Sequence, residues 1–146
     1  MIIVDSGYWF GLFDRKDANH NVCKTFLAQC REPMITTFPV LTETLHLLMR
    51  RESVHLAFQF LAFLPTLQQQ GNFSIFSLTD AHLPRLSELM IQYADLPMDL
   101  ADASLVLLAE ELGHGRILST DKRDFHTYRW KNHQPFTNLL EQELTK

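Results

Sequence analysis

The chain has 146 residues, of which 46% are hydrophobic, and a formal net charge of −4. This length suits one domain that hides about 70% of its unfolded surface, and it is short for two. The composition excludes a disordered chain, and the net negative charge excludes a protein that coats nucleic acid through a basic surface. We therefore expect one ordered domain over residues 1–146, with any contact to nucleic acid confined to a local site.

Neither a membrane span nor a targeting segment is visible in the sequence. The most apolar run, "LAFQFLAFL" at 56–64, is too short to cross a bilayer, and "MIIVD" at the N-terminus lacks a basic flank and a cleavage site. Cys23 and Cys30 are seven residues apart, without the C-x-x-C spacing of a redox or zinc site, so we expect small packing residues. These features predict a soluble, cytoplasmic protein without a membrane partner.

Apolar, β-rich runs alternate with segments of helical periodicity along the chain. The strands are expected at residues 1–4, 34–37, 73–77 and 116–120, with a weaker fifth near 134–137. The helices are expected at residues 17–31, 39–51, 53–69, 79–93 and 97–113. Parallel neighbours need crossover connections, which are usually helical. The alternation therefore predicts an α/β fold: a three-layer α/β/α sandwich with a central, mostly parallel sheet of four or five strands.

Acidic residues follow two of the expected strands. Asp5 comes directly after "IIV", and Asp121 comes directly after "RILST". Ligands of open α/β sheets bind outside the carboxyl ends of the strands. If these two strands are neighbours, both carboxylates project from one rim of the sheet.

Three further acids lie near the starts of expected helices. Asp99 and Asp102 are three residues apart and share a helix face, although helix capping alone explains both. Glu43, in "TTFPVLTETLHLL", lies at the edge of an apolar stripe, although by itself it suits an exposed helix position. We call Asp5, Glu43, Asp99, Asp102 and Asp121 the acidic cluster.

The acidic cluster predicts a cation site. Buried like charges are costly unless a cation neutralises them. A ligand set of carboxylate oxygens, with no cysteine and no required histidine, favours a hard ion. We therefore expect Mg²⁺ or Mn²⁺.

With these residues in this order, the chain resembles the PIN-domain family of metal-dependent ribonucleases, and within it the VapC-like toxins of prokaryotic toxin–antitoxin pairs. The resemblance is carried by five motifs in order: "IIVDSG", "DANH", "TTFPVLTETLHLL", "LPMDLADASLVLLAEELG" and "ILSTDKRDF". It implies a PIN-like fold in which four acids form the catalytic, metal-binding quartet: Asp5, Glu43, Asp102 and Asp121. Asp99 matches an additional acid that many members have, also a candidate metal ligand.

The resemblance also implies roles for neighbouring residues and a reaction. Ser6 and Thr120 match small hydroxyl residues beside the quartet, and Asp124 matches a frequent second acid, which a turn or N-cap role explains equally well. The implied reaction is hydrolysis of RNA by a metal-activated water, leaving a 5′-phosphate and a 3′-hydroxyl. The implied partners are an RNA substrate, a small antitoxin protein and a second copy of the chain.

Contacts to the RNA require cations and stacking surfaces near the acids. The candidates are Lys122 and Arg123, directly after Asp121, and the stretch "YRWKNH" with Arg129 and Trp130. A polar loop with one aromatic residue packed on the core explains that stretch equally well.

Other functions remain open at this level. One is a catalytically silent PIN-like module that binds RNA or protein, and another is a housekeeping RNA-processing nuclease without an antitoxin. The presence of all four quartet acids favours an enzyme. A haloacid-dehalogenase-like phosphatase is disfavoured, because Gly7 stands where such enzymes carry their second aspartate. A toxin would cut transfer or ribosomal RNA, whereas a housekeeping relative would act on messenger RNA or in ribosomal-RNA maturation.

Overall fold

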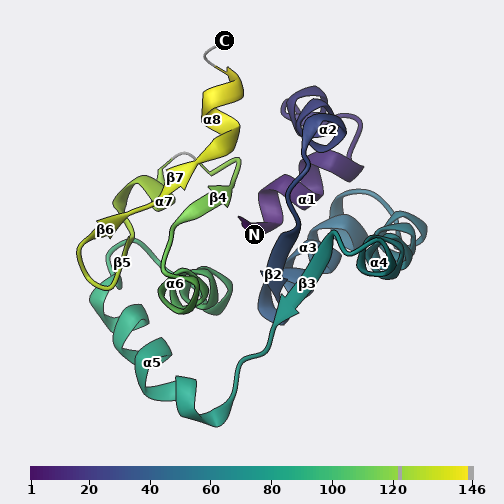
Figure 1. Cartoon of the computed structure of the whole chain (residues 1–146). Coiled ribbons are helices and arrows are strands. Elements are labelled where there is room, and N and C mark those ends of the chain that lie inside the picture. The colour runs from purple at the N-terminus through teal and green to yellow at the C-terminus, as the bar shows by residue number, and fades with distance from the viewer. Residues whose placement is uncertain (122, 145–146) are drawn as a thin grey trace.

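The computed structural model describes residues 1–121 and 123–144 and contains a central sheet of five parallel strands (Figure 1). The sheet order is β3-β2-β1-β4-β7, and each neighbouring pair is parallel. Its strands are β1 (Ile2–Val4), β2 (Met34–Thr37), β3 (Phe73–Phe76), β4 (Arg116–Leu118) and β7 (Thr137–Asn138). A separate antiparallel pair joins β5 (Arg129–Trp130) to β6 (Gln134–Pro135).

Helices cover both faces of this sheet (Figure 1). They are α1 (Ser6–Phe13), α2 (His20–Gln29), α3 (Phe38–Arg51), α4 (Val54–Gln69), η1 (Asp80–His82), α5 (Leu83–Gln92), α6 (Leu100–Leu112), α7 (Asp124–Thr127) and α8 (Leu139–Leu144). On one side lie α1, α3 and α4, and on the other lies α6, with α5 packed against it. The expected three-layer α/β sandwich is confirmed. Within the described residues, no helix combines the length and the hydropathy that a membrane span requires.

The strand order reverses between β1 and β4. From β1 the chain adds β2 and then β3 on one side, and only later places β4 on the other side of β1. The register pairs Ile3 with Ile117 and Val4 with Leu118, and the N–H of Asp5 continues the pairing by donating to the Leu118 carbonyl at 3.0 Å. Such a switch point opens the crevice in which α/β sheets bind their ligands. The fold therefore predicts a ligand-binding site at the switch point between β1 and β4.

The structure corrects the expected elements in several places, and β5, α7 and α8 were not expected. The expected strand at 134–137 is split, so that residues 134–135 pair with β5 and the fifth strand of the main sheet is residues 137–138. The last long helix begins at Leu100 rather than at 97, with Asp99 as its N-cap. Helix α1 was not expected, because its sequence "SGYWFGLF" is buried on several sides and has no polar face that would reveal a helical period.

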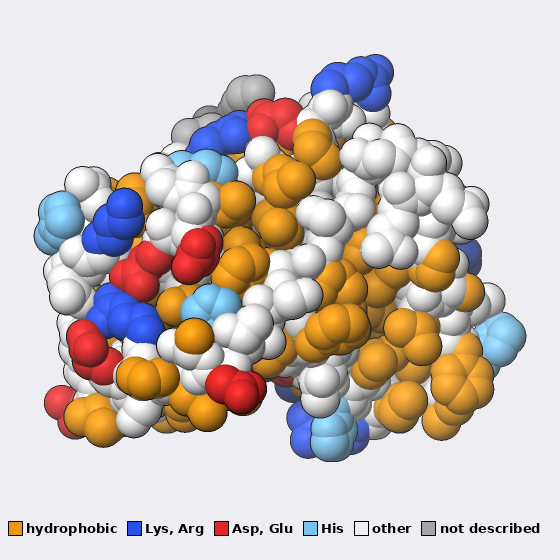
Figure 2. All heavy atoms as spheres, turned by 60° about the horizontal axis from the view of Figure 1, so that its bottom comes forward, with side chains coloured by type: hydrophobic (Ala, Val, Ile, Leu, Met, Phe, Trp, Pro, Cys, Tyr) orange, Lys and Arg blue, Asp and Glu red, His pale blue; other side chains and the backbone are white. Residues whose placement is uncertain are grey.

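The aromatic residues of α4 divide between the core and the surface. Phe60 is fully buried and packs on Trp9 of α1, with ring centroids 5.7 Å apart. Phe63 is half-buried against Phe13 at 5.4 Å, whereas Phe58 is 58% exposed. Phe58 belongs to an exposed apolar stripe that we call the α4 stripe: Val54, Phe58 and Leu61. Figure 2 shows hydrophobic side chains spread over the right half of the face it presents, on the side where α4 lies in Figure 1.

The contrast between Phe60 and Phe58 gives a matched test of this packing. Phe60→Ala removes a ring from a closed aromatic contact and should lower the free energy of unfolding by about 3–5 kcal/mol. Phe58→Ala should change it by less than about 0.5 kcal/mol, because the ring is largely in water. Urea denaturation of the two variants measures both values. Equal losses would show that the packing of α4 differs from this arrangement.

Candidate metal centre

Asp5 is buried at the carboxyl end of β1, with 5% of its surface exposed. It is the N-cap of α1, and one carboxylate oxygen accepts the backbone N–H of Ser6 at 2.7 Å. The other oxygen accepts the hydroxyl of Ser119 at 2.9 Å. A helix N-terminus favours a negative charge, which offsets part of the cost of burying this carboxylate.

Ser119 connects the two acids that follow β1 and β4. Its hydroxyl donates to Asp5 and accepts the backbone N–H of Asp121 at 3.0 Å. The backbone of Ser119 is held in turn by the side-chain amide of Asn138, which donates to its carbonyl at 2.7 Å and accepts its N–H at 3.2 Å. The buried hydroxyl of Ser119, directly after β4, thus fixes the loop that carries Asp121.

Thr120, expected beside the quartet, lies close to α1. Its side-chain oxygen lies 2.2 Å from the point that a β-carbon on Gly7 would occupy. The loop after β4 therefore approaches α1 closely because position 7 has no side chain. Thr120 thus lies against α1, and the hydroxyl of the neighbouring Ser119 contacts Asp5.

Glu43 reaches the same rim from the second turn of α3. It is half-buried and accepts a short hydrogen bond from the hydroxyl of Ser6. The expected position of Ser6 beside the quartet thus corresponds to a contact with Glu43. Glu43 and Asp99 also line one groove of about 450 Å³ together with residues of α3 and α6.

The start of α6 carries the remaining pair of acids. Asp99 is exposed, and its carboxylate caps the helix by accepting the backbone N–H of Asp102 at 2.8 Å. Asp102 is half-buried, and one of its carboxylate oxygens accepts the hydroxyl of Tyr128 at 3.2 Å. Capping therefore explains Asp99, but it leaves the carboxylate of Asp102 free to point toward the other acids.

Asp121, like Asp99, is an exposed member of the acidic cluster, and it organises the turn before α7. One of its oxygens accepts the backbone N–H groups of Arg123 at 3.0 Å and Asp124 at 3.1 Å. Burial alone would raise the pKa of Asp121, but these backbone donors outweigh it and the pKa is lowered. Asp121 therefore stays charged near neutral pH, while burial and the neighbouring Asp121 raise the pKa of Asp124.

The acids nearest the sheet interior repel one another. Burial, followed by the charges of Asp5 and Asp99, raises the pKa of Asp102 to about 8. Burial also raises the pKa of Glu43 to about 7, with Asp99 and Asp5 adding to the shift, and the pKa of Asp5 to about 6. Burial is the largest cause of all three shifts, and the charges of neighbouring acids add to it.

Neutral donors, rather than cationic side chains, hold these carboxylates. Within residues 1–121 and 123–144, no lysine or arginine forms a salt bridge with a member of the acidic cluster. The buried acids accept instead from Ser6, Ser119 and Tyr128. Hydroxyl donors fix orientation without cancelling charge, so the negative charge remains available to a cation.

A divalent hard cation fits this donor set by its chemistry, because carboxylate oxygens are the ligands that Mg²⁺ and Mn²⁺ prefer. As the side chains stand, no three His, Cys, Asp or Glu groups among the described residues are close enough to hold a metal ion.

The residues expected to touch RNA have different surroundings. Arg123 extends into solvent beside Asp121, with 83% of its side chain exposed. The guanidinium of Arg129 donates to three carbonyls at the end of α7, at 2.7, 3.2 and 2.9 Å, and the indole N–H of Trp130 donates to the Pro135 carbonyl at 3.0 Å. These contacts hold the β5–β6 pair in place. Lys122 lies outside the described residues.

Comparisons with known proteins agree with this fold. The profile of the PIN domain matches residues 2–131, and the chain belongs to the PIN domain family, a family of nucleases. Among solved structures, the chain is similar to VapC20 of Mycobacterium tuberculosis, described as a sarcin-ricin loop cleaving toxin, with a TM-score of 0.74 and 22% identity over 84% of this chain and 92% of that one. This likeness confirms the PIN/VapC fold. No curated protein sequence matches the chain.

The raised pKa of Asp102 makes a prediction about stability and pH. An unfolded aspartate titrates near about 4, whereas Asp102 in the fold titrates near about 8. The folded state thus retains a proton that the unfolded state has lost, so the metal-free protein should lose stability as the pH rises from about 4 to about 8, by up to about 1.4 kcal/mol per pH unit for one proton. Asp102→Asn should make this dependence shallower and stabilise the metal-free protein at pH ~8 more than at pH ~5.

Denaturation in EDTA at the two pH values measures this difference. Asp95→Asn, which neutralises an exposed acid shortly before α6, is the matched control and should leave the pH dependence as in the wild type. A variant at position 102 that loses stability at both pH values would mean that its carboxylate is a structural hydrogen-bond acceptor.

Proposed function

We propose that the protein is a Mg²⁺- or Mn²⁺-dependent endoribonuclease and the toxin of a toxin–antitoxin pair. The observation that carries this proposal is the convergence of five carboxylates from four elements at the switch point between β1 and β4, held by neutral donors. Membership in the PIN domain family supports the same chemistry.

The quartet Asp5, Glu43, Asp102 and Asp121 would hold the ion. A divalent cation bound there would activate water and neutralise charge that develops on the scissile phosphate. Asp121, whose pKa is lowered, offers a charged carboxylate from solvent. The three acids with raised pKa values would release their protons as the cation binds, which makes binding stronger at higher pH. Asp99, at the rim of the same groove, would add negative charge without being buried.

The side chains around the quartet would position both the acids and the RNA. Ser6 and Ser119 orient Glu43 and Asp5. Arg123, exposed beside Asp121, would contact a substrate phosphate. Thr120, Lys122, Arg129 and Trp130 complete the proposed substrate side. We propose hydrolysis that leaves a 5′-phosphate and a 3′-hydroxyl, with no covalent intermediate.

The proposed substrate is a structured RNA of the ribosomal or transfer class. The similar structure is that of a toxin described as cleaving the sarcin-ricin loop, which supports this class as the first to test. Fold likeness alone does not carry a substrate from one protein to another. The proposed place of action is the cytoplasm.

Protein partners are also part of the proposal. The α4 stripe exposes Val54, Phe58 and Leu61 at spacings of four and three residues, which is the periodicity of a helix face that packs against another protein. We propose that a second copy of the chain and a small antitoxin are the partners. A short gene directly upstream that encodes a small DNA-binding protein would support the second assignment.

Loss of metal-dependent cleavage in Asp102→Asn tests the proposed activity. The variant keeps the size and the hydrogen bond of the side chain but removes its charge, so it should fold and lose at least about 100-fold in cleavage of structured RNA with Mg²⁺ or Mn²⁺. Gel analysis of end-labelled RNA measures the rate and the chemistry of the new ends. Asp95→Asn should cleave like the wild type, and EDTA should abolish cleavage by both. Undiminished cleavage by rigorously purified Asp102→Asn would refute the proposal.

A further inference from the structure

Tyr128 brings a hydroxyl to the acidic cluster from outside the strand ends. The residue follows α7, and its side chain is completely buried. Its hydroxyl oxygen lies 3.2 Å from a carboxylate oxygen of Asp102 and 3.4 Å from the carbonyl of Leu96. Asp102 lies in the first turn of α6, and Leu96 lies in the turn that leads into this helix.

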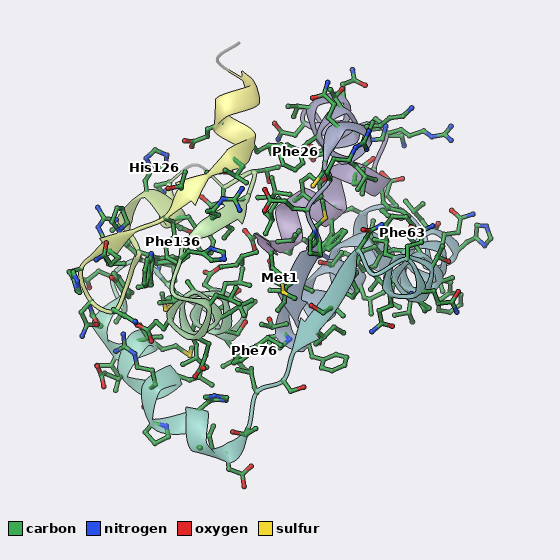
Figure 3. The ribbon with its side chains drawn as sticks, in the orientation of Figure 1. Met1, Phe26, Phe63, Phe76, His126 and Phe136 are labelled. Carbon is green, nitrogen blue, oxygen red and sulfur yellow. The ribbon has the colours of Figure 1, made fainter. Side chains whose placement is uncertain are left out.

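A row of aromatic rings fixes the position of this hydroxyl. Figure 3 shows Phe136 beside α7, and its ring packs edge-on against Phe125 at 5.2 Å. Phe125 packs against Tyr128 at 5.2 Å, and Tyr128 against Tyr93 at 5.1 Å. The hydroxyl of Tyr93 accepts the backbone N–H of Arg129 at 3.0 Å, which holds the chain directly after Tyr128. The ring of Tyr128 therefore has little freedom to turn its hydroxyl elsewhere.

The phenol has one proton and two acceptors within reach, so it donates to one of them at a time. A carboxylate is the stronger acceptor of the two, because hydrogen bonds to ionised groups are roughly twice as strong as those between neutral groups. In the part of the chain that the structure describes, Tyr128 is the side-chain donor found for the carboxylate of Asp102. The charges of Asp5 and Asp99 act on the same carboxylate, so the other acids of the cluster lie near it.

We propose that Tyr128 is a positioning residue for Asp102, which it holds in the orientation that a divalent cation requires. This inference rests on the proposed metal-dependent activity. It completes a pattern in which one buried hydroxyl serves each interior acid: Ser119 serves Asp5, and Ser6 serves Glu43. Loss of such a partner of a metal-ligating carboxylate typically costs about 10–100-fold in metal affinity or activity.

Binding of Mn²⁺ alone to the full chain tests the inference without RNA. Tyr128→Phe keeps the ring and removes only the hydroxyl, and it should weaken Mn²⁺ binding by about 10–100-fold, as measured from free Mn²⁺ by electron paramagnetic resonance. Tyr93→Phe is the matched control, because it removes a hydroxyl from the same row of rings that contacts no acid. It should bind Mn²⁺ like the wild type, even though it also loses a hydrogen bond.

A double-mutant cycle separates positioning from a general loss of stability. In an Asp102→Asn background, Tyr128→Phe should have little further effect on Mn²⁺ affinity, because the carboxylate that it orients is gone. If Tyr128→Phe weakens Mn²⁺ binding equally in the wild type and in Asp102→Asn, the inference is overturned. The Mn²⁺-dependent gain in the free energy of unfolding gives a second readout if Tyr128→Phe is less stable without metal.

The outcomes distinguish this inference from the proposed function. Wild-type Mn²⁺ affinity in Tyr128→Phe, together with its loss in Asp102→Asn, would overturn the role of Tyr128 and leave the nuclease proposal intact. A wild-type protein that binds no Mn²⁺ and cleaves no RNA would overturn both. Weaker binding in Tyr128→Phe but not in Tyr93→Phe would support the positioning role.

Discussion

Repulsion among carboxylates at the switch point is the constraint on which this structure depends. Two neighbouring parallel strands end in Asp5 and in the loop of Asp121, and two helices bring Glu43 and Asp102 to the same rim. Clustered like charges in a partly buried site raise one another's pKa values and oppose folding when no cation is present. The surrounding fold therefore has to hold these groups in place against their own electrostatics.

The fold does this with dipoles and hydroxyls instead of opposite charges. Asp5 and Asp99 cap helices whose N-termini favour anions, and the interior acids accept from buried hydroxyl groups. The arginines of strong ion pairs act elsewhere: Arg85 binds Glu110 at 2.7 Å, far along α6 from its start. An arginine paired directly with the acids would stabilise the empty site and compete with a metal, whereas Arg123, beside Asp121, pairs with Asp124. Neutral donors keep the site both folded and negatively charged.

The sequence predicted the sheet and its acids because both depend on short-range patterns. An acid that directly follows a buried strand lies at the carboxyl rim of the sheet. The helical segments between the strands indicate that neighbouring strands are parallel. It did not reveal Ser119, although the register supplies the reason: Val4 pairs with Leu118, so the residues that follow them, Asp5 and Ser119, face each other. Recognising this requires knowing that β1 and β4 are neighbours, which local pattern does not encode.

The stretch "YRWKNH" shows a second limit, because composition does not give the direction of a side chain. Its mixture of basic and aromatic residues is typical of single-strand binders, yet Tyr128 points inward to Asp102 and Arg129 closes the end of α7. Residues of this stretch thus support the acidic cluster from inside the fold. The exposed residues near the cluster come from other parts of the chain. Arg123 extends into solvent beside Asp121, and Phe38 and Leu100 line the groove that Glu43 and Asp99 share. In the proposed function the acids would supply the chemistry and these outer residues would meet the RNA, so the choice of substrate could change without any change in the fold.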